Sequence, residues 1–329
     1  MMSNDNLITR QVEEYIEYKR SLGYSLTVPA EELKRFAAFT REIGHNGSLT
    51  SDLAIRWAMV KSSYSREYMA TRLETVHTFA KYIIAFDSSA QLPQLGVFGK
   101  KSRRVSPYIY TNEEIVLLMA EAKMLFSPDG IRAYTVSAAI GLLRAAGLRI
   151  SELTLLKNED VHLEKGYLFI NSSKFRKDRI VPLHPSAIQE LEKYSYFIAE
   201  KLGQRSGDDY FFVNSYGREF NIRSFEYAFQ LIRPILYKDK AHGKVPHIRL
   251  YDVRHTFACE TIRHWLESGV DVNQKLHLLS TYMGHVKPED TYWYLSATPD
   301  LLAISCKKYE TAFGSVLVQF DGEGCQYEA

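Results

Sequence analysis

The stretch Gly147-Leu-Arg149-Ile-Ser-Glu152-Leu153 places two opposite charges at the end of a long apolar segment. Residues 131–146, which precede it, predict an apolar helix that stops at the glycine. Arg149 and Glu152 are three positions apart, so one helical turn can bring the guanidinium and the carboxylate together. Because an unpaired charge beside apolar residues is costly, this stretch predicts a paired polar site at the edge of a helical core.

The chain on either side of this stretch predicts more helices and a small sheet. Tyr167-Leu-Phe-Ile and Arg179-Ile-Val-Pro-Leu are typical of short strands in a hairpin or small sheet. From Pro185 to about Phe313 the pattern is largely helical again. Upstream, Thr111-Asn-Glu-Glu114 has the pattern of a capping box, which predicts the start of a helix. This part of the chain is therefore predicted to be mainly α-helical with a small antiparallel β-sheet.

The first part of the chain predicts a smaller, separate helical domain. Residues 6 to about 85 contain four segments with apolar residues at helical spacing. Prolines and glycines then appear around a basic run, which is typical of a linker. We expect a helical domain at 1–88, a linker at 89–108, a larger domain at 109–315 and an acidic tail at 316–329.

Composition is that of an ordinary globular protein. The chain has 329 residues, 46% of them hydrophobic, and a formal net charge of +2. No apolar run approaches the roughly 20 residues that span a bilayer, and the polar N-terminus has no apolar signal region, so we expect a cytoplasmic protein. Three widely separated cysteines lack metal-ligand spacing, so we expect neither a metal site nor a disulfide framework: Cys259, Cys306 and Cys325.

A set of polar residues in the second half suits the cleavage of a phosphodiester without a metal. Such a reaction needs groups that hold the phosphoryl oxygens, a nucleophile, and a proton donor for the leaving oxygen. Arginine suits the first task because its planar fork donates two parallel hydrogen bonds and keeps its charge. The members of the set are, in chain order, Arg149, Lys174, Arg254, His285 and Tyr294.

Each of these residues alone is more often a surface or packing residue, but their order and spacing resemble the tyrosine recombinases, or phage-type integrases. Gly147–Leu153 matches the first arginine box of that family, and Ser-Lys174-Phe-Arg-Lys-Asp-Arg-Ile-Val-Pro matches its lysine-bearing hairpin. Asp252-Val-Arg254-His255-Thr-Phe-Ala matches the second arginine box. Met283-Gly-His285 is followed by Tyr294 nine residues after the histidine, as in the closing box. The likeness covers about 111–310, and phrases such as Asp290-Thr-Tyr-Trp-Tyr look most like recombinases of transposons and other mobile elements.

The resemblance implies a fold, an activity and roles. It implies an N-terminal core-binding (SAM-like) domain at 1–88, a recombinase catalytic domain at 109–315, and cleavage and rejoining of DNA through a 3′-phosphotyrosyl link to Tyr294. Arg149, Arg254 and His285 would stabilise the transition state, Lys174 would protonate the 5′-oxygen, and Glu152 would support Arg149. No metal, nucleotide or other cofactor is implied.

The set departs from the family pattern at Tyr251, where a histidine is usual. A phenol can donate a hydrogen bond but is a poor base at pH 7. Three interpretations stay open: Tyr251 donates to the phosphate, His247 or His255 replaces the missing histidine, or the protein works with a partner recombinase. Tyr292 is a rival nucleophile, but the family spacing favours Tyr294.

The implied partner is double-stranded DNA with an inverted-repeat core site. A homotetramer would bind it, or this chain would bind it together with partner recombinases. The DNA-bound protein would be associated with the nucleoid, and no membrane is implied. Alternatives are a non-catalytic DNA-binding accessory protein of a recombination complex, or a type IB topoisomerase-like enzyme that nicks and reseals. Two basic clusters are expected to bind DNA: Lys100, Lys101, Arg103 and Arg104 in the linker, and Arg176, Lys177 and Arg179 in the hairpin.

Overall fold

A computed structural model describes residues 6–99, 106–171, 178–237, 248–285 and 287–297, with side chains described as far as Leu295. The chain divides into two compact units, residues 1–105 and 106–329. Each unit has its own hydrophobic core.

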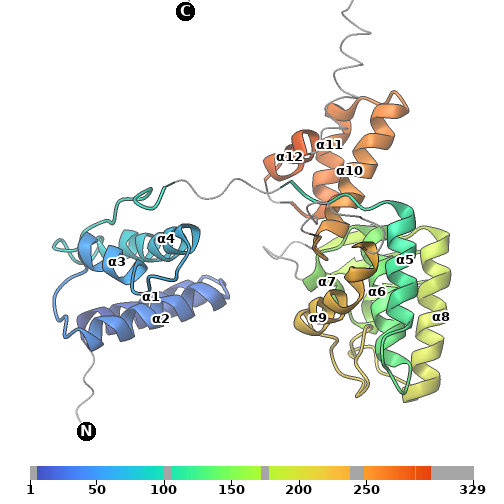
Figure 1. Cartoon of the computed structure of the whole chain (residues 1–329), viewed down its shortest axis with the longest axis horizontal. Helices are drawn as coiled ribbons and strands as arrows, with labels where there is room; N and C mark the ends of the chain where they lie inside the picture. The colour runs from blue at the N-terminus through green and yellow to red at the C-terminus, as the bar shows by residue number, and fades with distance from the viewer. Residues whose placement is uncertain (1–5, 100–105, 172–177, 238–247, 286, 298–329) are drawn as a thin grey trace, which may run out of the picture. The chain divides into compact units, whose positions relative to one another are not determined.

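The first unit contains four helices in the part of it that the structure describes, coloured blue to blue-green in Figure 1. They are α1 (Leu7–Ser21), α2 (Thr27–Glu42), α3 (Ser51–Ala58) and α4 (Arg66–Ile83). Asn6, Thr50 and Ser65 cap three of the helix N-termini by accepting a backbone N–H in the first turn. The apolar faces meet in one core around Phe36 and Phe79, both fully buried.

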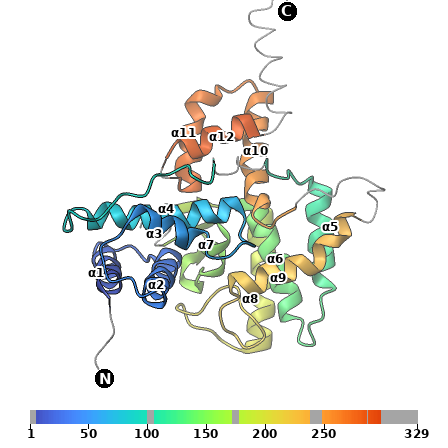
Figure 2. The same ribbon diagram turned by 60° about the vertical axis from the view of Figure 1, so that its left-hand side comes forward.

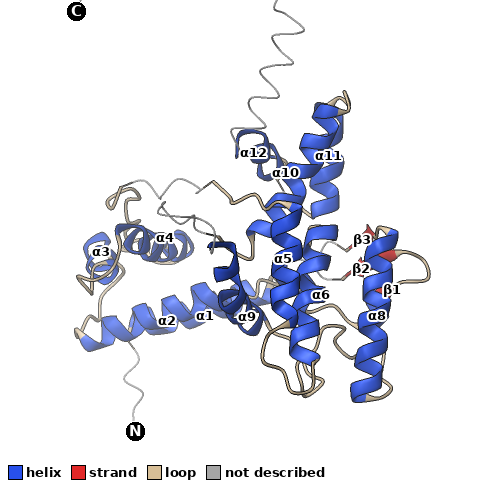
Figure 3. Ribbon diagram, turned by 45° about the vertical axis from the view of Figure 1, so that its right-hand side comes forward, coloured by secondary structure: helices blue, strands red, loops and turns tan. Residues whose placement is uncertain are grey.

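The second unit is mainly helical, with one small sheet that Figure 3 shows in red. Its elements are α5 (Asn112–Lys123), α6 (Ile131–Ala146), α7 (Ile150–Thr154), β1 (Val161–His162), β2 (Tyr167–Ile170), β3 (Arg179–Pro182), α8 (Pro185–Leu202), α9 (Ile222–Ile232), α10 (Asp252–Glu267), α11 (Val272–Met283) and α12 (Glu289–Ala297). Short 3₁₀ turns lie at Asn158–Asp160 and Arg233–Tyr237. The sheet order is β1-β2-β3, antiparallel throughout. The predicted fold class is confirmed.

Helix α6 is the centre of this unit, and most of its residues are buried, among them Val136, Ile140 and Leu143. It packs against α5, α8 and α10. The predicted capping box starts α5: the Thr111 hydroxyl accepts the Glu114 N–H at 3.2 Å, and the Glu114 carboxylate accepts the Thr111 N–H at 3.1 Å. The predicted helical run after Pro185 is interrupted at Gly203, where a φ of 80° ends α8. The loop that follows buries Phe211 and Phe212 in the core.

Helices α10 to α12, the last three that the structure describes, lie together (Figure 2) and form a second, smaller core within the unit. Its buried members include Ile262, Leu276, Met283 and Tyr294. Tyr294 is thus held between α10 and α11 by the same packing that forms this core. No helix in the described ranges is long and apolar enough to cross a membrane.

Candidate active site

Arg149 and Glu152 form the first half of the site at the start of α7. Arg149 is the N-cap residue, and Glu152 lies in the first turn. The Arg149 Nη1 donates to Glu152 Oε1 at 2.6 Å, and the Arg149 backbone N–H donates to Oε2 at 2.9 Å. The other end of the guanidinium donates through Nη2 to the Gly284 carbonyl at 2.5 Å. The pairing predicted from the three-residue spacing is therefore present and holds the arginine in one orientation.

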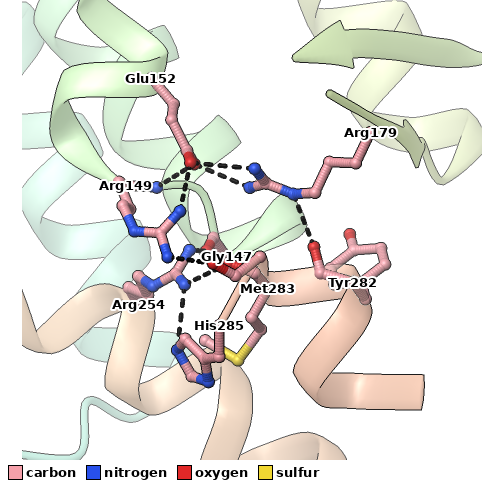
Figure 4. Close-up of polar contacts among 9 residues, drawn as sticks. Gly147, Arg149, Glu152, Arg179, Arg254, Tyr282, Met283 and His285 are labelled. Atoms are coloured by element: carbon pink, nitrogen blue, oxygen red, sulfur yellow. Dashed lines mark hydrogen bonds and ion pairs between the residues drawn. The ribbon is translucent and has the colours of Figure 1, made fainter. Parts of the chain in front are cut away.

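Arg179 completes the coordination of the same carboxylate, which the sequence did not predict. Its Nη1 and Nη2 donate to the two oxygens of Glu152 at 2.9 and 2.7 Å, and its Nε donates to the Tyr282 carbonyl at 2.7 Å (Figure 4). The side chain is only 8% exposed. The expectation that Arg179 belongs to a DNA-binding surface cluster is corrected here, because β3 turns its guanidinium into the protein, where these contacts use it.

Arg254 is the most deeply buried cation of the site. It lies in the first turn of α10 and is 2% exposed. Its Nη1 donates to the Gly147 carbonyl at 2.5 Å and its Nη2 to the Met283 carbonyl at 2.6 Å, so it joins the C-terminal ends of α6 and α11 (Figure 4). Its Nε is buried and has no hydrogen-bond partner among the described residues. One strong donor thus stays available in the centre of the site.

The charges of the site are unbalanced in favour of the cations. Burial alone would raise the pKa of Glu152, but the hydrogen bonds and charges of Arg179 and Arg149 lower it to about 2. Burial, and then the charge of Arg149, lower the pKa of Arg254 to about 10. The site therefore has three guanidiniums and a single carboxylate, which pairs with Arg149 and Arg179 only. An anion bound between Arg149 and Arg254 would relieve their repulsion.

His285 lies beside Arg254, just after the left-handed Gly284 that ends α11. Its Nε2 is 3.3 Å from Arg254 Nη2, and its Nδ1 is 2.7 Å from the Thr291 hydroxyl. A guanidinium can only donate, so Nε2 accepts and the proton resides on Nδ1. Burial and the neighbouring arginines lower the pKa of His285 to about 4, which agrees with a neutral ring.

Tyr294 projects from α12 into the space between two histidines. It is 2% exposed, whereas Tyr292 is 49% exposed. The Tyr294 hydroxyl is 3.1 Å from His255 Nδ1, and its ring stacks on His285 with 6.1 Å between ring centres. Burial raises the pKa of the Tyr294 phenol above its usual value. Of the two tyrosines, only Tyr294 is enclosed with the histidines, as the motif spacing predicts for a nucleophile.

Tyr251 is at the rim of this space. It is the N-cap residue of α10 and is 43% exposed. Its ring meets the His255 ring edge to face, with 4.8 Å between centres. The structure thus places Tyr251 beside the tyrosine–histidine pair, with its side chain partly open to solvent.

Several predicted residues lie outside the described ranges: Lys174, His247, the linker cluster Lys100, Lys101, Arg103 and Arg104, and Arg176 and Lys177 of the hairpin. Within the described ranges no group of histidine, cysteine or acidic side chains could hold a metal ion. Cys259 is a buried free thiol.

Comparison with known proteins places the chain in a family. A model described as the phage integrase family matches residues 109–300. This chain belongs to that family. It is accordingly a tyrosine-type site-specific recombinase, as its sequence predicted.

Relatives and solved structures agree with this placement. The chain is 34% identical to y4rB, a candidate integrase/recombinase of Sinorhizobium fredii (strain NBRC 101917 / NGR234), over 91% of this chain and 96% of y4rB. It is 27% identical to the tyrosine recombinase XerC of Chlamydia trachomatis serovar D (strain ATCC VR-885 / DSM 19411 / UW-3/Cx), over 71% of this chain and 68% of XerC. A structure of the Tn1549 transposon integrase with transposon right end DNA has a TM-score of 0.65 at 15% identity, covering 91% of this chain and 98% of that one. A post-cleavage complex of the XerH site-specific recombinase has a TM-score of 0.62 at 16% identity, covering 94% and 86%.

Proposed function

We propose that this recombinase cuts and rejoins double-stranded DNA through a covalent 3′-phosphotyrosyl intermediate on Tyr294. The observation that carries the proposal is the convergence of a buried tyrosine hydroxyl and two arginines from separate elements. Arg149 begins α7, Arg254 belongs to α10 and Tyr294 to α12, yet all three meet around the Met283–His285 turn.

The two arginines are suited to hold the scissile phosphate. Each donates hydrogen bonds to backbone carbonyls, Arg149 to Gly284 and Arg254 to Gly147 and Met283. These contacts fix the guanidinium planes before DNA arrives, so little rotamer freedom is lost when phosphate binds. The buried Nε of Arg254 is one donor that the phosphate would use.

Tyr294 would attack the phosphorus and displace the 5′-oxygen, which Lys174 would protonate. The phosphotyrosyl bond stores the energy of the broken phosphodiester, so the reverse attack by a 5′-hydroxyl rejoins the strand without ATP. The guanidiniums supply the positive charge that a metal supplies elsewhere, and the proposed reaction requires none. Tyr251, at the rim, would donate a hydrogen bond to a phosphoryl oxygen.

We further propose that the residue 1–88 domain and the catalytic domain both bind a core site made of inverted repeats, with the basic clusters at 100–104 and 174–177 on the DNA backbone. A symmetric site implies several protein copies, either of this chain or of partner recombinases. The solved structures of the Tn1549 integrase and of XerH are complexes with transposon right end DNA and with a palindromic difH substrate, which supports a DNA substrate here. The sequence around Tyr294 resembles that of transposon recombinases, which favours a mobile element as the source of the DNA core site.

A nicked suicide substrate tests the proposal, because loss of a short 5′ fragment traps the covalent intermediate. We expect wild-type protein and Tyr292→Phe to form a covalent protein–DNA adduct and Tyr294→Phe to form none, since Tyr294 alone is enclosed with the histidines. Denaturing electrophoresis and peptide mapping of the adduct provide the measurement.

Three outcomes would change the assignment. DNA binding without any adduct would indicate an accessory protein, and adduct formation without recombinant products from two sites would indicate a topoisomerase-like enzyme. An adduct that persists in Tyr294→Phe would overturn the choice of nucleophile.

A further inference from the structure

The proposed attack leaves one proton without an acceptor. The Tyr294 hydroxyl must lose its proton as it bonds to phosphorus, and burial makes that proton harder to remove. Tyr251 occupies the position where a histidine is usual in the family, and a neutral phenol is a poor acceptor. A different group therefore has to take the proton.

We propose, on the basis of the function above, that His255 is the general base that accepts the Tyr294 proton. Its Nδ1 lies 3.1 Å from the Tyr294 oxygen, which is hydrogen-bonding distance. His285, the other histidine beside Tyr294, is unsuited because its Nε2 accepts from Arg254 and its Nδ1 carries the proton that it donates to Thr291. Of the two imidazole rings that contact Tyr294, only that of His255 forms a hydrogen bond with the phenol oxygen among the described contacts.

The fold holds the His255 ring in this position. His255 is one helical turn after Tyr251, whose ring meets it edge to face at 4.8 Å. Trp293 contacts it from α12, with 5.4 Å between ring centres. The imidazole thus has ring contacts with Tyr251 and Trp293 as well as with Tyr294, and Tyr251 is a positioning residue for it.

The surroundings keep His255 in the form that can accept a proton. Burial lowers the pKa of His255 to about 4, so the ring is neutral at pH 7. Besides the two tyrosines, the ionisable groups that act on the ring are Asp252, Arg249, Arg254 and His285. The negative charge that develops on the phosphoryl oxygens would stabilise the imidazolium as it forms.

The step balances within the proposed reaction. The Tyr294 O–H bond breaks and its proton moves to His255 Nδ1, while the oxygen forms a bond to phosphorus. The bond from phosphorus to the 5′-oxygen breaks, and that oxygen receives a proton from Lys174. In the rejoining step His255 returns its proton to the departing Tyr294 oxygen, so the imidazole ends as it began.

Single-turnover cleavage of the suicide substrate, at saturating full-length protein, tests this role separately from DNA binding. General base catalysis contributes about 10²–10⁴-fold, so we expect His255→Ala and His255→Asn to slow adduct formation by at least about 100-fold. In His255→Asn the amide would retain an acceptor atom near the position of Nδ1 but could not take a proton. The matched control is His264→Ala, a histidine exposed on the same helix, which should cleave at the wild-type rate.

Added imidazole should restore part of the rate to His255→Ala but not to Tyr294→Phe, which a purely structural role for His255 would not predict. A His255→Asn protein that cleaves within about threefold of wild type would overturn the proposal, as would a defect that vanishes at saturating protein. If wild-type protein itself forms no adduct on Tyr294, the proposed function fails first. If the adduct forms and the His255 variants are unaffected, only the assignment of the base fails.

Discussion

At the scale of single residues, the site shows how one carboxylate can organise several cations. Glu152 receives two hydrogen bonds from Arg179 and two from Arg149, one of them from the backbone. Each of its oxygens therefore accepts two hydrogen bonds. The carboxylate fixes both arginines although it takes no part in the proposed reaction itself. Arg149 is free to present its remaining N–H groups to a phosphate because Glu152 and Gly284 already define its plane.

Replacing Arg179 with methionine tests this arrangement. Removal of one partner from a buried ion pair typically costs about 3–5 kcal/mol, because the other charge stays buried. We expect Arg179→Met to lower the free energy of unfolding of the second unit by roughly 3 kcal/mol, as measured by denaturant titration. Arg223→Met, at an exposed position on α9, should leave stability near the wild-type value. Unchanged stability together with weakened DNA binding would instead indicate that Arg179 contacts DNA.

At the scale of elements, Gly147 joins α6 to α10 and to Arg254. It ends α6 with φ 59°, and its carbonyl accepts from Arg254. A Cβ at this position would lie 2.4 Å from a ring carbon of Phe257 on α10. The glycine of the first arginine box is therefore required both by backbone conformation and by the close packing of a neighbouring helix.

The change Gly147→Ala should be more harmful than a glycine change without this contact. The left-handed conformation costs a non-glycine residue about 1–2 kcal/mol, and the clash with Phe257 must add to it by moving α10 away from α6. We expect a lower thermal midpoint than for Gly269→Ala, where φ is +77° and no atom lies within 4 Å of the added carbon. Cleavage should fall as well, because α10 carries both Arg254 and His255. Equal midpoints for the two variants would show that the packing at Gly147 can relax.

The elements were more predictable than the contacts between them. Apolar periodicity and the Thr111 capping box predicted α1 to α6 closely, because these signals are local. Arg149 with Glu152 was also predictable, since both lie on one turn. The position of Arg179 was not predictable, because its partner Glu152 is 27 positions away in the sequence. In addition, the basic residues of a hairpin are usually exposed to solvent. The contact between His255 and Tyr294 spans 39 positions and depends on how α12 packs on α10, which no local pattern specifies.

At the scale of the molecule, the buried histidines couple the site to the stability of the fold. The pKa of His255 and of His285 is lowered to about 4 in the folded protein, chiefly by burial, against about 6.5 for an exposed histidine. The unfolded chain therefore binds more protons between these values. The stabilisation from the neutral rings is fully present above pH 6.5 and is lost as the pH falls toward 4.

We expect the free energy of unfolding of the second unit to fall by on the order of 2–3 kcal/mol between pH 6.5 and pH 5, with the two rings contributing about equally. Glu152 should contribute little in this range, because its carboxyl is ionised in both states there: its pKa is about 2 in the folded protein, against an ordinary value of 4.5. Thermal unfolding in a pH series measures the effect, and the double variant His255→Asn, His285→Asn should flatten the dependence. A decline of the same slope in the double variant would mean that other groups cause it. A flat profile in the wild type would show that the fold does not lower the pKa of either ring.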